Sequence, residues 1–90
     1  MTRYKLIYKL SAIRDLQKLP RKIVDAVISF CEGPLLDSPH RVGKPLINKY
    51  AGFHTAKRGS YRIVYEIREE EVVVYVAFVG SRADVYRPRG

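Results

Sequence analysis

The fold of this chain is decided by residues 53–79, which read FHTAKRGSYRIVYEIREEEVVVYVAFV. β-Branched and aromatic residues dominate this stretch and predict successive strands. The expected strands are 53–58, 61–68 and 72–79. Gly59-Ser60 suits a two-residue hairpin loop, because glycine tolerates a positive φ. The last strand is apolar on both faces, which is typical of a strand inside a sheet.

Upstream of this stretch, residues 3–9 alternate in polarity and predict a further strand. Residues 37–52 are rich in Pro and Gly and indicate an ordered loop, with Leu46 as its expected anchor in the core. Between these segments, apolar residues recur at helical spacing and predict a helical hairpin over residues 11–35.

The helical hairpin carries its own boundary signals. Ser11 is expected to cap the first helix. Pro20 interrupts the pattern and suits the start of the second helix. Gly33-Pro34 is expected to end this helix or to loosen its last turn. Cys31 falls within the apolar stripe and is expected to be a small core residue.

The order β-α-α-β-β-β predicts an α+β domain spanning residues 1–90, with the helical hairpin packed on one face of a small antiparallel sheet. The other face is left for function. The end of the chain, 82–90, is expected to be a short polar tail or one helical turn. No apolar stretch approaches the ~20 residues of a membrane span, so no membrane association is expected and the expected compartment is the cytoplasm.

The chain is strongly basic, with a formal charge of +8 from 17 Lys and Arg against 9 Asp and Glu. That much positive charge on a small domain favours an anionic partner, such as nucleic acid, an acidic protein or an anionic membrane. The alternative is a soluble basic protein without such a partner.

The predicted hairpin at Gly59-Ser60 gathers cations. If the loop has two residues, Lys57 lies directly across from Arg62. Like charges in that position lower the stability of the sheet unless they bind an anion. Thr55 would share their face, while Tyr61, Ile63, Tyr65 and Ile67 would face the helices. The alternatives are a solvated outer face without function, or a bulged turn that moves Lys57 out of the cluster.

A second basic element follows the last strand. Arg82 and Tyr86 are four residues apart and would share one face of a helical turn. A basic tail with a surface Tyr is the equally weighted alternative.

The residue types exclude several chemistries. The sequence has no CxxC, HExxH, P-loop or dinucleotide-binding motif, its histidines are isolated and its serines lack a triad pattern, so neither a metal site nor a cofactor is expected. Arg, Lys and Tyr remain, and these groups can cleave RNA, because RNA carries its own nucleophile in the 2′-OH.

The chain resembles the RelE branch of the RelE/ParE toxin superfamily along nearly its whole length. The resemblance is carried by Gly43-Lys44-Pro45-Leu46, by Lys57-Arg58-Gly59-Ser60-Tyr61-Arg62-Ile63-Val64-Tyr65, by Arg82-Ala83-Asp84-Val85-Tyr86 after the Val-rich strand, and by the Asp15 to Pro20 segment. It implies the toxin of a type II toxin–antitoxin system, a metal-independent endoribonuclease that binds the ribosomal A site, cuts mRNA and inhibits translation. It also implies a cognate antitoxin that offers an acidic or amphipathic segment and forms a hetero-oligomer with the toxin.

The resemblance assigns roles to four residues. Arg62 would stabilise the phosphate, Arg82 would act as acid or charge stabiliser, Tyr86 would be the base, and Lys57 keeps a basic position on the preceding strand. Thr55 stands where relatives place a second cation.

Lys44 or Arg58 is expected to compensate for this missing cation and, with Thr55, to contact RNA. A different gap would place His54 and Ala56 at the two basic positions, but the cross-strand pairing favours Thr55 and Lys57. Two alternatives stay open: a ParE-like inhibitor of DNA gyrase, and a degenerate, non-catalytic RNA- or protein-binding member.

Overall fold

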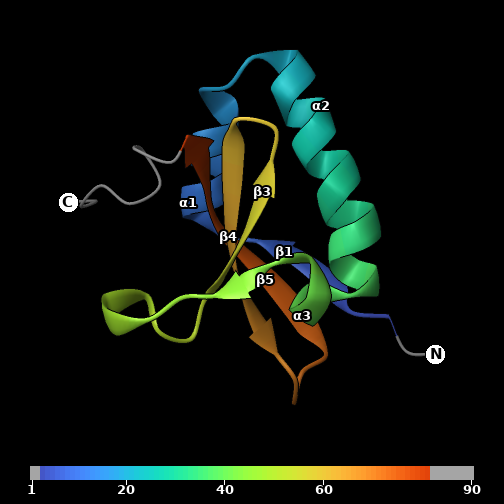
Figure 1. Ribbon diagram of the computed structural model, residues 1–90. Coiled ribbons are helices and arrows are strands. Elements are labelled where there is room, and N and C mark those ends of the chain that lie inside the picture. The colour runs from blue at the N-terminus through green and yellow to red at the C-terminus, as the bar shows by residue number, and fades with distance from the viewer. Residues whose placement is uncertain (1–2, 82–90) are drawn as a thin grey trace.

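The computed structural model describes residues 3–81 and shows helices covering one face of a five-stranded sheet (Figure 1). The order across the sheet is β1-β5-β4-β3-β2. The strands are β1 (Lys5–Tyr8), β2 (Lys44–Pro45), β3 (His54–Arg58), β4 (Tyr61–Arg68) and β5 (Val73–Ser81). The predicted α+β class and the interior position of the last strand are confirmed. The prediction for 82–90 lies outside the described residues.

Strand β1 makes the sheet mixed, and the prediction of a wholly antiparallel sheet is wrong at this edge. β1 pairs parallel with β5, with Lys5 opposite Val73 and Tyr8 opposite Val76, whereas the other neighbouring strands pair antiparallel. The reason is topological. Parallel neighbours need a long crossover connection, and the helical hairpin that follows β1 provides part of one.

The helical hairpin consists of α1 (Leu10–Gln17) and α2 (Arg21–Phe30). Pro20 precedes α2, and its carbonyl accepts hydrogen bonds from the N–H groups of Ile23 and Val24, each at 3.0 Å. Helix α2 ends at Phe30, and Gly33-Pro34 lies in the wider π-helical turn that follows it, η1 (Cys31–Leu35), so the predicted loosening of the last turn is confirmed. Pro34 lacks an N–H, and the wider turn accommodates it within a continuing helical path.

The segment predicted as an ordered loop contains three short elements, α3 (Pro39–Val42), β2 and the 3-10 helix η2 (Asn48–Tyr50). Leu46 is only partly buried, and Val42 packs against the core instead. The Tyr65 hydroxyl donates a hydrogen bond of 2.6 Å to the carbonyl of Pro39 and so ties α3 to the sheet. A side chain at Gly43 would strike this hydroxyl, which explains the glycine.

The core lies between the helices and the sheet. Its buried members include Ala12 of α1, Val27 and Phe30 of α2, Cys31 and Leu35 of η1, and Ile63, Tyr65, Val74, Val76 and Val79 of the strands. The predicted apolar stripe of the second helix is therefore confirmed. Cys31 is fully buried as predicted, and burial raises the pKa of its thiol to about 11.

Helix α1 completes the outer edge of β5 where β1 ends. Strand β1 pairs with β5 only as far as Val76, so this edge of β5 has no strand partner farther along. The register of β4 against β5 also shifts here, and Ala77 is the additional residue of β5 at the shift. Ser11 Oγ donates to the Ala77 carbonyl at 2.5 Å, and the Val79 N–H donates to the buried Asp15 carboxylate at 2.9 Å. Ser11 is thus not the predicted helix cap, because α1 already begins at Leu10.

Replacing Asp15 by Ala is expected to lower the free energy of unfolding by about 1–3 kcal/mol, because the buried N–H of Val79 loses its acceptor. Asp15→Asn keeps an acceptor oxygen and should cost less. Urea unfolding followed by circular dichroism measures both. Asp25→Ala, at an exposed position of α2, is the matched control, and equal stability of Asp15→Ala and this control would refute the role of the carboxylate.

Candidate functional site

The β3–β4 hairpin has the predicted two-residue loop, with Gly59 at a φ of 61°. Lys57 pairs directly with Arg62, as predicted. Residues that face each other in an antiparallel pair project from the same face of the sheet. Their neighbours Ala56 and Ile63 belong to the core beneath the helices. Lys57 and Arg62 therefore project together from the opposite side, which we name the open face.

The open face continues across β3 onto β2. Thr55 lies two residues before Lys57 and so projects from the same side, and Lys44 pairs directly with Thr55. The structure thus brings Lys44, Thr55, Lys57 and Arg62 onto one surface formed by β2, β3 and β4. The Thr55 hydroxyl is buried and has no hydrogen-bond partner within residues 3–81.

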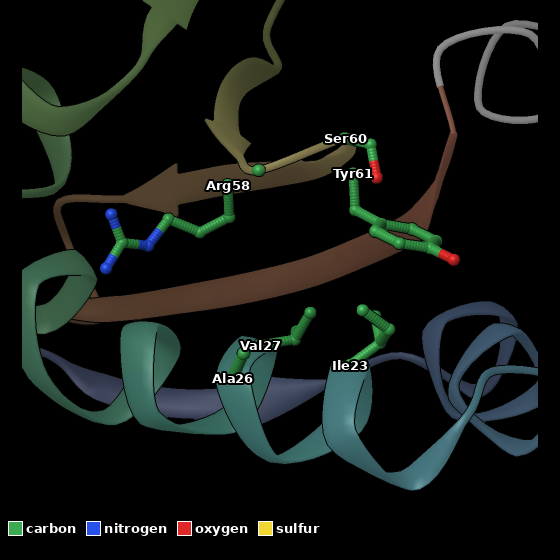
Figure 2. Close-up of a pocket in the computed structure, with 7 residues that line it drawn as sticks. Ile23, Ala26, Val27, Arg58, Ser60 and Tyr61 are labelled. Carbon is green, nitrogen blue, oxygen red and sulfur yellow. The ribbon is translucent and has the colours of Figure 1, made fainter.

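Arg58 projects from the other side of the hairpin. Its guanidinium lies over the ring of Phe30, 5.1 Å from the ring centroid. Figure 2 shows Arg58 above α2, beside the pocket that it lines with Val27. Arg58 is therefore separated by the sheet from Lys57 and Arg62, and we do not include it in the candidate site.

The ion pairs within residues 3–81 involve charged groups outside the hairpin cations. These ion pairs lie away from the β3–β4 turn. The pairs are Arg3–Asp37 (2.9 Å), Lys9–Glu66 (3.4 Å), Arg68–Glu66 (3.1 Å), Arg68–Glu71 (3.6 Å) and His40–Glu69. Lys57 and Arg62 pair with no acid in this part of the chain. Their adjacent, uncompensated charges create a positive potential suited to an anion.

Strand β5 runs beside this pair of cations. Gly80 lies opposite Arg62 and Ser81 opposite Tyr61. Gly80 carries no side chain and is itself buried. Arg82 and Tyr86, the other predicted catalytic residues, lie outside the described residues.

The sequence does not predict a polar cluster that lies away from the β3–β4 turn. Tyr4 Oη donates to Glu69 at 2.8 Å, and His40 contacts the same carboxylate. The rings of His40 and His54 meet edge to face at 5.7 Å, and His54 stacks on Tyr65 at the same distance. The histidines are isolated in sequence, so only the packing of α3 against β3 brings them together.

The tyrosine pKa values that shift within residues 3–81 move away from a catalytic base. Burial raises the pKa of Tyr65 to about 12, and a hydrogen bond to Glu71 raises that of Tyr75. Burial also raises the pKa of Tyr8. These hydroxyls hold their protons more tightly than free tyrosine does.

Two further observations concern residues 3–81 only. Nowhere in that range do three or more His, Cys, Asp or Glu side chains gather in a way that could hold a metal ion. No helix there is long and apolar enough to cross a membrane.

Comparison with known proteins places this geometry in a family. Residues 6–86 match the model of the ParE toxin of type II toxin–antitoxin systems, parDE. Toxin RelE and Toxin RelG of Mycobacterium tuberculosis are each 45% identical to the chain over 84 residues. The match covers 93% of this chain, 87% of Toxin RelE and 97% of Toxin RelG. The chain belongs to the RelE/ParE family of type II toxins.

A solved structure supports the same assignment. The crystal structure of the RelBE2 toxin–antitoxin complex of M. tuberculosis contains a chain with 42% identity and a TM-score of 0.86. The match covers 90% of this chain and 100% of that one. The resemblance found in the sequence is confirmed, and the protein is a RelE-like toxin.

The imidazole of His54 in this RelE-like toxin should titrate below pH 6.5, because burial and then the neighbouring His40 lower its pKa. A lowered pKa means that the unfolded chain binds the proton more readily. The contribution of His54 to stability is therefore complete above pH 6.5 and is lost as pH falls toward the folded pKa.

Two-dimensional NMR of the imidazole resonances measures this pKa directly, and His40→Gln should raise it. A His54 pKa above 6.5 in the folded toxin would contradict the expectation.

Proposed function

We propose that this toxin is a ribosome-dependent endoribonuclease that cleaves mRNA in the ribosomal A site and so inhibits translation. The observation that carries the proposal is the cross-strand pair of Lys57 and Arg62, which lies on the open face without an acidic partner in the described range. Such a pair is unfavourable in the free protein and favourable around a phosphate. The names of the 45% identical relatives, Toxin RelE and Toxin RelG, support the same class.

The chemistry needs only the 2′-OH of the RNA and the side chains of the toxin. The 2′-OH of the substrate attacks the adjacent phosphate, and negative charge builds on the phosphorane-like transition state. Lys57 and Arg62 stabilise that charge, which a metal ion does in other nucleases. Lys44 and Thr55, farther along the open face, hold the neighbouring RNA backbone.

Proton transfer is assigned to the end of the chain. Tyr86 takes the proton from the 2′-OH, and Arg82 serves as acid or charge stabiliser at the leaving 5′-oxygen. Support comes from the sequence, where Arg82 directly follows the last described residue of β5, next to the row of Arg62 and Gly80. The raised pKa values of Tyr8, Tyr65 and Tyr75 make these residues poor alternatives to Tyr86.

The proposed partner is a cognate antitoxin that holds the toxin inactive in a hetero-oligomer. The RelBE2 structure from M. tuberculosis is a toxin–antitoxin complex, and its similar chain supports this proposal. The net charge of +8 favours an antitoxin segment that carries acidic side chains. An enzyme that acts on ribosomes works in the cytoplasm.

A second candidate is inhibition of DNA gyrase. The matching family model, which describes ParE toxins, is the observation that favours it. Mapping mRNA 5′ ends after induction without antitoxin separates the candidates. New ends within coding regions support cleavage. A DNA-damage response without new ends supports gyrase inhibition, and no growth arrest supports a non-catalytic member in which Thr55 replaces the missing cation.

Lys57→Ala and Arg62→Ala should each slow cleavage of ribosome-bound mRNA by about a hundredfold, because each removes a charge that acts on the transition state. Single-turnover cleavage measures the rate. Lys49→Ala, which removes the same charge from the exposed η2, is the control. Cleavage at the control rate in both variants would exclude the open face as the site.

Arg82→Ala and Tyr86→Phe should restore growth when the toxin is induced alone, because each removes a proton-transfer or charge-stabilising group. Colony counts measure toxicity, and circular dichroism checks folding. Full toxicity in both folded variants would disprove the assignment of these two residues.

A further inference from the structure

A groove lies on the side of the hairpin that faces away from the Lys57–Arg62 pair. It occupies about 360 Å³ between α2 and the β3–β4 turn. Figure 2 shows Ile23, Ala26 and Val27 of α2 below it and Arg58 and Tyr61 of the hairpin above it. A space of this size lies in the range of pockets that take up ligand groups, and its α2 wall is wholly apolar.

The groove has polar groups at its two ends. Figure 2 shows the Arg58 guanidinium at one end and the Tyr61 hydroxyl at the other. Arg58 is exposed, and within residues 3–81 it forms no ion pair. Its contact is the face of Phe30, which leaves the N–H edges of the guanidinium available for a carboxylate.

We propose that this groove binds a segment of the cognate antitoxin that carries apolar side chains and a carboxylate. The inference rests on the antitoxin partner proposed above. The apolar side chains would pack on Ile23, Ala26 and Val27, and the carboxylate would pair with Arg58.

Charge and polarity favour this occupant over others. RNA would place its charged backbone against the apolar wall of α2, which burial disfavours. A second copy of the toxin would bring another net charge of +8 to a basic surface. An acidic, amphipathic protein segment satisfies both the wall and the Arg58 end.

The hairpin then serves two partners on its two faces. Lys57 and Arg58 are adjacent on β3 and project to opposite sides of the sheet. Antitoxin binding through Arg58 and phosphate binding through Lys57 are therefore separable by substitution. An antitoxin segment in the groove would contact the hairpin on the Arg58 side and would not contact Lys57 or Arg62.

The test uses isothermal titration calorimetry of the full-length toxin with the antitoxin encoded in the same operon. Arg58→Glu removes the cation, and Ala26→Trp fills the groove from its exposed position on α2 without changing charge. Both variants should weaken binding at least about tenfold. Lys57→Glu makes the same charge change as Arg58→Glu on the opposite face and should bind within about threefold of the unaltered toxin.

Four outcomes would overturn the assignment. The first is wild-type antitoxin affinity in both folded groove variants, and the second is equal weakening of antitoxin binding by Lys57→Glu and Arg58→Glu. The third is a changed oligomeric state of the Ala26→Trp toxin without antitoxin. The fourth is loss of mRNA cleavage by Arg58→Glu with unchanged antitoxin affinity. The third would indicate a second copy in the groove, and the fourth an RNA contact.

The endoribonuclease proposal and the groove assignment can be refuted independently. If the unaltered toxin bound no antitoxin, both the partner and the groove assignment would fall. If it cleaved no mRNA while the groove variants still lost the antitoxin, the endoribonuclease proposal alone would fall.

Discussion

The register of the β3–β4 hairpin is the constraint on which the rest of the structure depends. A shift of one residue would move every side chain of these strands to the other face. Gly59, at a φ of 61°, permits the two-residue loop that fixes the register. The same register buries Ala56 and Ile63 under the helices and leaves Lys57 and Arg62 on the open face. Core and site are therefore consequences of one turn.

The second requirement is that β5 extend well beyond the edge strand that covers it. β1 pairs with only the first part of β5, and Ser11 and Asp15 of α1 satisfy the backbone where β1 is absent. A buried strand edge without such partners would leave costly unpaired polar groups. Helix α1 thus both covers the core and extends the sheet toward Gly80, beside Arg62.

The alternation of polar and apolar residues and the glycine of the turn were enough to predict β3, β4, β5 and the Lys57–Arg62 pairing. Both signals depend only on residues that are close in sequence. The parallel pairing of β1 was missed because alternation reveals a strand but not its partner. The short elements α3, β2 and η2 are too brief for periodicity to register.

Among the candidate site residues, Arg58 was grouped with the cations by charge, although alternation alone placed it on the side of Ile63. The His40–His54 contact depends on tertiary packing, which sequence spacing does not encode. Within residues 3–81 the ion pairs do not include Lys57 or Arg62, so these two charges are left uncompensated at the hairpin. Dissolved salt screens charges exposed in this way, so the attraction of a polyanion to the hairpin should weaken as ionic strength rises.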